Sequence, residues 1–141
     1  MLRLKSPASE RLFQSPGLEA TFGGGEANVT VSLALFGESA TFVTALPDNP
    51  VGDGALRELR RYGVETAGIK CAKGRLGIYF LETGANQRAS TVVYAREGSC
   101  ISQVKPGFFD WPALLKGANW FHITGIPRLC PGLPPTAPTR R

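Results

Sequence analysis

The segment Phe22-Gly23-Gly24-Gly25-Glu26-Ala27-Asn28 connects a β-rich stretch at 18–22 to an apolar run whose helical spacing ends at Gly37. Glycine has no β-carbon, so the chain can turn tightly here and a ligand can approach the backbone closely. The free N–H groups of the first helical turn point back at the glycines and favour a polar ligand. The pattern therefore predicts a strand, a turn and a helix. Two interpretations of the turn stay open: a ligand site, or a tight connection with no further role.

The elements that follow continue the alternation of strand and helix. Residues 40–46 are β-rich and almost continuously apolar, which is typical of a buried parallel strand. The next four residues, 47–50, predict a turn because two prolines flank an Asp-Asn pair. Residues 52–62 then show the spacing of an amphipathic helix, and we expect Asp53 to cap it.

The second half of the chain has a different texture. The apolar segments 78–81 and 91–94 are separated by a polar stretch that contains glycine, which predicts a hairpin and thus a small antiparallel layer beside the main sheet. Residues 109–117 indicate a short helix with Asp110 as its N-cap. The apolar run 119–124 predicts a strand that returns to the main sheet.

Composition and charge exclude several classes of protein. With 43% hydrophobic and 19% charged residues, the chain of 141 residues suits one folded domain or a piece of a larger one. No apolar run approaches the ~18 residues that span a bilayer, and no apolar core of a signal peptide follows Met1. We therefore expect a cytoplasmic location and no membrane partner. The net charge of +5 is dispersed, so no nucleic-acid partner is expected either.

The residues that commonly hold metals do not cluster in this sequence. Cys71, Cys100 and Cys130 are far apart and form no Cys-x-x-Cys pair, so neither a zinc site nor a disulfide framework is predicted. The single histidine, His122, lies in an apolar run and is expected to be a hydrogen-bonded core residue.

Polar side chains that could reach a ligand gather at the glycine turn and on the predicted hairpin. Asn28 falls in the first helical turn, where its amide can donate to and accept from a hydroxyl-rich ligand. Tyr94 and Arg96 are two residues apart on a strand and share a face, and Tyr79 on the facing strand could converge with them. A phenol and a guanidinium suit a small molecule with a carboxylate. The alternative is an edge-strand pair that only packs.

Several blocks of this sequence resemble the ribokinase family of carbohydrate kinases, of the phosphofructokinase-B type. These blocks are Phe22 to Asn28, Leu46 to Asp53 and Leu59 to Val64. Within that family, three further blocks resemble the 2-keto-3-deoxygluconate kinases: Gly74 to Glu82, Val92 to Ser99 and Phe121 to Ile126. The resemblance covers residues 1–126 and implies an α/β class with a partial ribokinase-like fold. In that fold a central, mostly parallel sheet carries helices and a small antiparallel β lid, with the lid strands within about 69–96.

For function, the resemblance implies transfer of the γ-phosphoryl group of ATP, with Mg²⁺, to a hydroxyl of a small keto-sugar acid. It implies a sugar site made of turn, lid and backbone positions: Gly24, Gly25, Glu26, Ala27, Asn28, Tyr79, Tyr94, Arg96 and Ile126. Arg96 is the residue suited to a charge on the ligand. Ala95 stands where some relatives carry an aromatic residue, which implies a slightly different wall.

The sequence also departs from the family's pattern at both ends. Relatives begin with a strand that ends in Gly-Glu, and after the position of Ile126 they continue with the ATP site and a Gly-Ala-Gly-Asp turn whose Asp is the catalytic base. Neither part is found here, so no catalytic residue is assigned and we expect neither ATP nor Mg²⁺ to bind this chain well. The proline-rich stretch 127–141 predicts a disordered tail. These features favour a frameshift or gene-model error near Ile126 and an internal or misplaced start at Met1.

Three classes of function remain open. The first is a fragment of a sugar-acid kinase, inactive as written. The second is a non-catalytic sugar-binding or dimerisation module, in which the lid forms a homo-oligomer. The third is an unrelated Rossmann-like nucleotide binder, which is disfavoured because the glycines match neither Gly-x-Gly-x-x-Gly nor a P-loop. A partial sheet would expose strand edges and apolar faces, so we expect marginal stability of the isolated chain.

Overall fold

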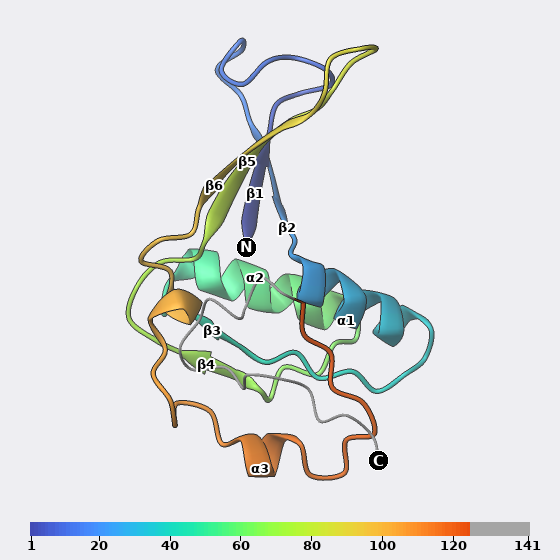
Figure 1. The fold of residues 1–141 in the computed structure, drawn as a ribbon, viewed down its shortest axis with the longest axis vertical. Coiled ribbons are helices and arrows are strands. Elements are labelled where there is room, and N and C mark those ends of the chain that lie inside the picture. Colours follow the sequence, from blue (N-terminus) through green and yellow to red (C-terminus); the bar gives the residue numbers. More distant parts are fainter. Residues whose placement is uncertain (125–141) are drawn as a thin grey trace.

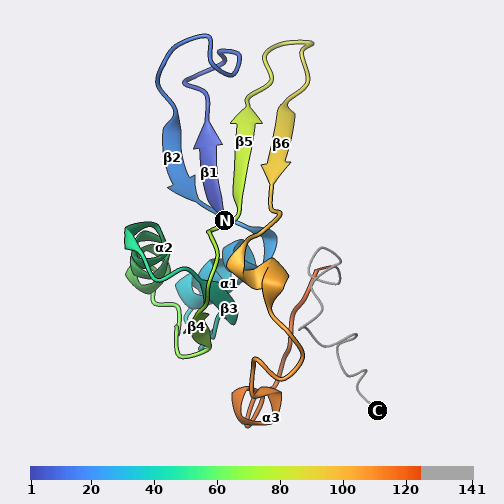
Figure 2. The same cartoon turned by 90° about the vertical axis from the view of Figure 1, so that its left-hand side faces the viewer.

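The structure is a computed structural model that describes residues 1–124 (Figure 1). The predictions made for Ile126 and for the tail at 127–141 lie outside the described residues. The elements follow in the order β1 (Leu2–Lys5), β2 (Glu19–Phe22), α1 (Gly25–Leu35), β3 (Thr44–Leu46), α2 (Pro50–Arg61), β4 (Ile69–Cys71), β5 (Ile78–Glu82), β6 (Thr91–Ala95), a 3-10 helix (Cys100–Gln103) and α3 (Trp111–Leu114). They form an upright sheet that stands on a base of helices and two short strands (Figures 1 and 2).

The upright sheet is the lid, and it is larger than the sequence predicts. Its four strands lie in the order β2-β1-β5-β6. The predicted hairpin is present, since β5 and β6 pair antiparallel with Tyr79 opposite Tyr94. However, β1 adds to β5 in parallel, with Leu2 beside Ile78, and β2 pairs antiparallel with β1. The lid is therefore a mixed sheet that includes the N-terminal strands, rather than a two-stranded antiparallel layer.

The base carries the parallel pairing expected of the main sheet. The strands β3 and β4 pair in parallel, with Thr44 beside Ile69. Residues Ile69–Cys71, at the start of the range predicted for the lid, therefore belong to the base. Successive residues of β3 pack on opposite sides, as strand geometry requires. Ala45 packs with Cys100, Val104 and Phe109, whereas Leu46 packs with Ala55 and Leu76. The α/β class is thus confirmed.

The second helix begins earlier than predicted because its N-cap is Asn49. The side-chain oxygen of Asn49 accepts from the N–H groups of Val51 and Gly52, each at 3.1 Å. Pro50 occupies the first helical turn, where its missing N–H costs no hydrogen bond. Asp53 lies inside the first turn, so the prediction that Asp53 caps the helix is wrong. Its carboxylate still favours the helix dipole there.

The prediction for the last described segment is partly wrong. Asp110 does cap α3, accepting from the N–H of Ala113 at 3.2 Å, but α3 spans only Trp111–Leu114. Residues 119–124 are not a strand, and His122 is exposed rather than part of the core. The apolar run does not pair with the described strands, and Thr124 instead contacts Glu26 of α1. An apolar pattern alone does not create a strand without a partner edge.

The helix α1 keeps much apolar surface uncovered. It has no buried residues, although most of its side chains are apolar. Leu35 at 66% and the adjoining Phe36 at 81% exposure continue this surface, and Trp120 is 76% exposed. None of the helices within residues 1–124 has the length and apolar character that crossing a bilayer requires.

Candidate sugar-binding site

The glycine turn forms the first wall of the candidate site. Gly24 is the N-cap of α1 and has φ 153°, a conformation that essentially only glycine adopts. The first helical hydrogen bond runs from the N–H of Asn28 to the carbonyl of Gly24 at 2.8 Å. Gly23 is tied to the start of β1, because its N–H donates to the carbonyl of Met1 at 3.0 Å. The turn is therefore anchored to the foot of the lid.

A tyrosine of the lid reaches this turn. The hydroxyl oxygen of Tyr79 lies 3.3 Å from where a β-carbon would be at Gly23. The same β-carbon would lie 3.9 Å from the side-chain oxygen of Asn28. The absence of a side chain at Gly23 thus lets a phenol from β5 approach the start of α1. Two of the regions predicted to form the site are brought together in this way.

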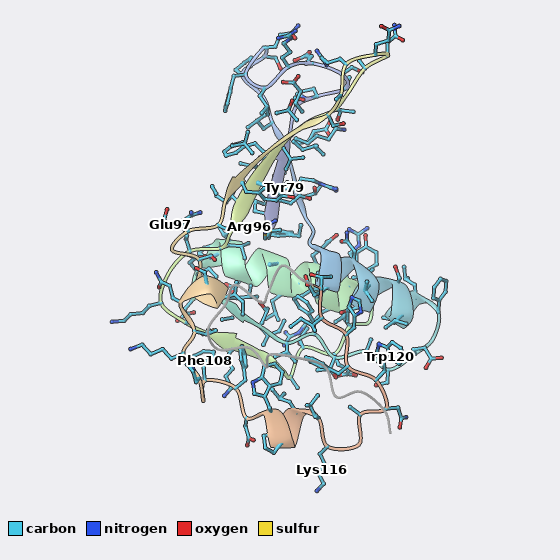
Figure 3. All side chains as sticks on the ribbon, viewed as in Figure 1. Tyr79, Arg96, Glu97, Phe108, Lys116 and Trp120 are labelled. Atoms are coloured by element: carbon cyan, nitrogen blue, oxygen red, sulfur yellow. The ribbon has the colours of Figure 1, made fainter. Side chains whose placement is uncertain are left out.

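Tyr79, Tyr94 and Arg96 form a continuous stack at the foot of the lid. The rings of the two tyrosines have centroids 5.9 Å apart and are tilted by 39°. The guanidinium carbon of Arg96 lies 3.8 Å from the centroid of Tyr94, as in a cation–π contact. Figure 3 shows Tyr79 and Arg96 at the junction between lid and base. The Nε of Arg96 is buried without a hydrogen-bond partner among the described residues.

A cavity of about 600 Å³ opens beside these groups. Five of the predicted site residues line it: Gly24, Glu26, Ala27, Asn28 and Arg96. Gly25, Tyr79 and Tyr94 are not part of its lining, although Arg96 stacks on Tyr94, which in turn packs against Tyr79. The remaining predicted residue, Ile126, lies outside the described part of the chain.

Glu26 is engaged by the end of the described chain rather than free in the cavity. Its Oε1 accepts a hydrogen bond from the backbone N–H of Thr124 at 3.2 Å and another from the Thr124 hydroxyl. A β-carbon at Gly25 would lie 3.5 Å from a methyl group of the same threonine. These two predicted residues therefore position the segment that leads towards Ile126.

Two arginines that the sequence did not indicate as site residues also line the cavity. Arg3 lies on β1, and its Nε donates to the hydroxyl of Thr21 at 2.8 Å. Arg75 precedes β5 and donates to the carbonyl of Ala95 at 3.0 Å and to that of Glu97 at 2.6 Å. Both reach the cavity through pairing between distant strands. No local signal in the sequence could have shown this.

Charged side chains of both signs line the cavity, because Glu26, Glu58 and Glu97 accompany three arginines. Arg3, Arg75 and Arg96 line it, and none of them forms an ion pair within residues 1–124. The pKa of the Met1 ammonium group, which also lines the cavity, is lowered, first by burial and next by the charge of Arg96, while Glu26 opposes the shift. Burial, which disfavours the charged form of an amine, is the larger cause of this shift.

Residues for a metal ion are not assembled in the described part of the chain. No three His, Cys, Asp or Glu side chains within residues 1–124 converge as metal ligands would. Mg²⁺ requires several oxygen ligands in near-octahedral geometry. The described residues therefore do not fit a Mg²⁺ site of their own, and we derive no step through a metal.

Comparisons with known proteins identify relatives of this sequence and of this fold. Residues 2–138 match the profile of the pfkB family carbohydrate kinases. A crystal structure of 2-dehydro-3-deoxygluconokinase from Thermotoga maritima is similar, with 52% identity, a TM-score of 0.87, and coverage of 89% of this chain and 39% of that one. A pfkB family carbohydrate kinase from Listeria grayi has 38% identity, a TM-score of 0.79, and coverage of 83% and 37%. The 2-dehydro-3-deoxygalactonokinase of Haloferax volcanii is 35% identical over 126 residues, 89% of this chain and 39% of the relative.

The fold, the turn and the match over most of the sequence define the class of protein. This chain belongs to the pfkB family of carbohydrate kinases. Two of these relatives are named as a 2-dehydro-3-deoxygluconokinase and a 2-dehydro-3-deoxygalactonokinase. The chain spans about 39% of the length of those two relatives.

Proposed function

We propose that this chain is the sugar-binding part of a kinase for a keto-sugar acid of the 2-keto-3-deoxygluconate type. The observation that carries the proposal is the placement of Arg96, whose buried Nε has no partner within residues 1–124, on a cavity that the glycine turn also lines. A bidentate guanidinium is well matched to a carboxylate. Two relatives named for 2-dehydro-3-deoxy sugar acids support this class of ligand.

Each wall has a separate role in the proposed complex. The backbone at Gly24 and the amide of Asn28 bind hydroxyl groups of the sugar, since glycine allows close approach and the amide both donates and accepts. Arg96 binds the carboxylate, and the stack with Tyr94 holds the guanidinium in place. Tyr79 closes the site from the lid side, next to Gly23. Of the remaining predicted residues, Gly25, Glu26 and Ala27 shape the wall around the start of α1, and Ile126 lies outside the described residues.

We assign phosphoryl transfer to parts of the enzyme other than the described residues. The whole enzyme of this family uses ATP with Mg²⁺ by resemblance, and phosphoryl transfer depends on positioned nucleotide, metal and base. The described residues offer no metal cluster and the sequence has no P-loop. The proposal is therefore that this chain binds the sugar acid without phosphorylating it.

The experiment is a calorimetric titration of the chain with 2-keto-3-deoxygluconate and with 2-keto-3-deoxygalactonate, run beside an ATP-dependent phosphorylation assay. Binding of either acid without turnover supports the proposal. Turnover would contradict the assignment of catalysis to other parts. Binding of ATP without either acid would favour a nucleotide-binding protein instead and would overturn the proposal.

A second candidate function is dimerisation through the lid. The outer strand β6 is an edge of the lid sheet, and Val92, Val93 and Tyr94 are 41%, 50% and 56% exposed. Exposed apolar edge strands commonly pair with another chain. Sedimentation of the chain at several concentrations, beside a Val93→Lys variant, tests this. A dimer that the variant abolishes supports the lid as the interface, whereas a monomer throughout contradicts it.

A further inference from the structure

Two connections between the base and the lid meet closely at the foot of the lid. Residues 74–77 lead up into β5, and residues 96–100 lead down from β6. A β-carbon at Gly74 would lie 3.1 Å from the carbonyl oxygen of Gly98 and 3.2 Å from the backbone nitrogen of Cys100. With φ at 128°, Gly74 also has a conformation that other residues rarely adopt. Glycine at this position therefore lets the two connections approach each other.

The side chain of Arg75 joins the two connections. Its Nη1 donates to the carbonyl of Ala95 at 3.0 Å, and its Nη2 donates to the carbonyl of Glu97 at 2.6 Å. A guanidinium is planar, so its terminal nitrogens hold two acceptors in a fixed relative position. The two acceptors come immediately before and after Arg96 in the chain. Arg75 thus restrains the backbone on both sides of the residue that is proposed to bind the carboxylate.

Arg96 lies just beyond the end of the lid sheet. The register between β5 and β6 ends where Ala95 pairs with Ile78, so Arg96 is the first residue after the ladder. Its carbonyl accepts from the N–H of Ser99 at 3.1 Å, inside the connection that leads to the base. The two hydrogen bonds from Arg75 therefore restrain the chain at the point where strand pairing ends.

The side chain of Arg96 depends on this backbone for its position. Its guanidinium carbon lies 3.8 Å from the centroid of the Tyr94 ring, and the residue lines the cavity. Its Nε is buried and has no hydrogen-bond partner within residues 1–124, so no polar contact from those residues fixes that atom. A shift of the Arg96 backbone would move the guanidinium relative to Tyr94 and to the cavity at once. Figure 3 shows Arg96 and Glu97 together at the foot of the lid.

We propose that Arg75 is a positioning residue for Arg96: it holds the carbonyls of Ala95 and Glu97 and thereby presents the Arg96 guanidinium to the carboxylate of the ligand. This role rests on the proposed binding of a sugar acid and deepens it. Arg75 also lines the cavity, so the alternative is that it contacts the ligand itself. Both of its terminal nitrogens already donate to backbone carbonyls, which favours the positioning role.

The test compares Arg75→Lys with Arg96→Gln by calorimetric titration with 2-keto-3-deoxygluconate. Lysine keeps the positive charge but has no planar fork, so it cannot hold both carbonyls. The Kd of Arg75→Lys should rise by about tenfold, as is typical of residues coupled in one network. The double variant should bind no more weakly than Arg96→Gln alone, and the amide of the sugar acid should bind Arg75→Lys like the unchanged chain. Arg11→Lys, at an exposed position outside the cavity, is the matched control.

A second measurement needs no sugar. Hydrogen exchange of the Arg96 Nε–H, followed by NMR, should be about tenfold faster in Arg75→Lys, because a loosened backbone exposes this buried group more often. The amides of α2 should keep their exchange rates, which shows that the variant is folded.

Three results would overturn the positioning role. The first is unchanged exchange of the Arg96 Nε–H in Arg75→Lys. The second is equal weakening of the acid and its amide. The third is a double variant that is weaker than Arg96→Gln by the full factor of Arg75→Lys, since Arg75 would then act independently of Arg96. If the unchanged chain binds no sugar acid, the proposed function fails, and the exchange measurement alone decides whether Arg75 positions Arg96.

Discussion

The hydroxyl oxygen of Tyr79 lies 3.3 Å from the place of a β-carbon at Gly23. This contact joins the lid to the glycine turn. Gly23 and Tyr79 are 56 residues apart in the sequence, from position 23 to position 79. It ties the orientation of the lid to the backbone at the start of α1. The two walls of the proposed sugar site are therefore mechanically linked, and substitution at either residue should be felt at the other.

A double-mutant cycle measures this link. Gly23→Ala places a methyl group against the Tyr79 hydroxyl, so we expect it to lower the free energy of unfolding by about 1 kcal/mol, as overpacking typically does. Tyr79→Phe removes the hydroxyl and should relieve most of that cost in the double variant. Urea unfolding of the four proteins gives the coupling. Additive effects of the two substitutions would show that the residues do not interact.

The conformation of Gly24 should make it intolerant of any side chain. With φ at 153°, Gly24→Ala is strained regardless of space, and we expect a loss of about 1–3 kcal/mol in the free energy of unfolding. Gly17→Ala is the matched control, since a β-carbon there would meet nothing within 4 Å. That control should change stability by less than about 0.5 kcal/mol. Equal effects of the two variants would contradict the strained turn.

Asn49 and Asp53 have different roles at the start of α2, and their substitutions should differ in cost. Asn49→Ala removes the acceptor of two backbone N–H groups and should cost about 1 kcal/mol of stability. Asp53→Ala should cost only about 0.3–1 kcal/mol, because Asp53 acts through the helix dipole alone. Thermal or urea unfolding of both variants distinguishes the roles. A larger loss for Asp53→Ala would restore Asp53 as the cap.

The two cysteines of the described chain should differ sharply in reactivity. Cys71 is exposed, whereas Cys100 is 1% exposed and packs with Ala45 and Phe109. In a Cys130→Ser background, Cys71 should react with a thiol reagent at the rate of a free thiol, and Cys100 should react only after unfolding. Mass spectrometry of the singly modified protein identifies the site. Rapid labelling of Cys100 in the folded chain would contradict its burial.

The buried thiol of Cys100 should make the free energy of unfolding depend on pH. Burial, and to a lesser extent the neighbouring Cys71, raises the pKa of the Cys100 thiol above its ordinary value of 9.0, against a backbone hydrogen bond that lowers it. Above pH 9 the unfolded chain therefore binds fewer protons than the folded chain, so the free energy of unfolding falls as pH rises. Urea unfolding between pH 8 and pH 10 should show this fall, and Cys100→Val should reduce it. A rise in stability over that range, relative to Cys100→Val, would contradict the sign.

Local patterns in the sequence predicted the elements whose structure depends only on neighbouring residues. The glycine turn and the start of α1 follow from backbone freedom at Gly24 and helical spacing after it. The cap at Asn49 was also visible, since Asn followed by Pro is a common helix start, but the prolines favoured a turn interpretation. The strand predicted at 18–22 is confirmed as β2. Strand β1 has four residues and pairs with strands far away in the sequence, so its local signal was weak.

The same limit applies to the site. Tyr94 and Arg96 were predicted to share a face because strand periodicity is local, and their stacking confirms it. Arg3 and Arg75 were missed because only the pairing of β1 with β5 brings them to the cavity. The apolar run at 119–124 was wrongly predicted as a strand, because a strand needs a partner edge that periodicity cannot show.

The most direct test of the account is the affinity of Arg96→Gln for 2-keto-3-deoxygluconate, measured by calorimetry against the unchanged chain. Loss of a hydrogen bond to a charged group costs about 1.5–3 kcal/mol, so the Kd should rise by about 10-fold to 100-fold. The amide of the same sugar acid, which lacks the carboxylate, should bind both proteins equally. Arg57→Gln, at an exposed position of α2, is the matched control and should bind like the unchanged chain. An affinity of Arg96→Gln equal to that of the unchanged chain would contradict the account.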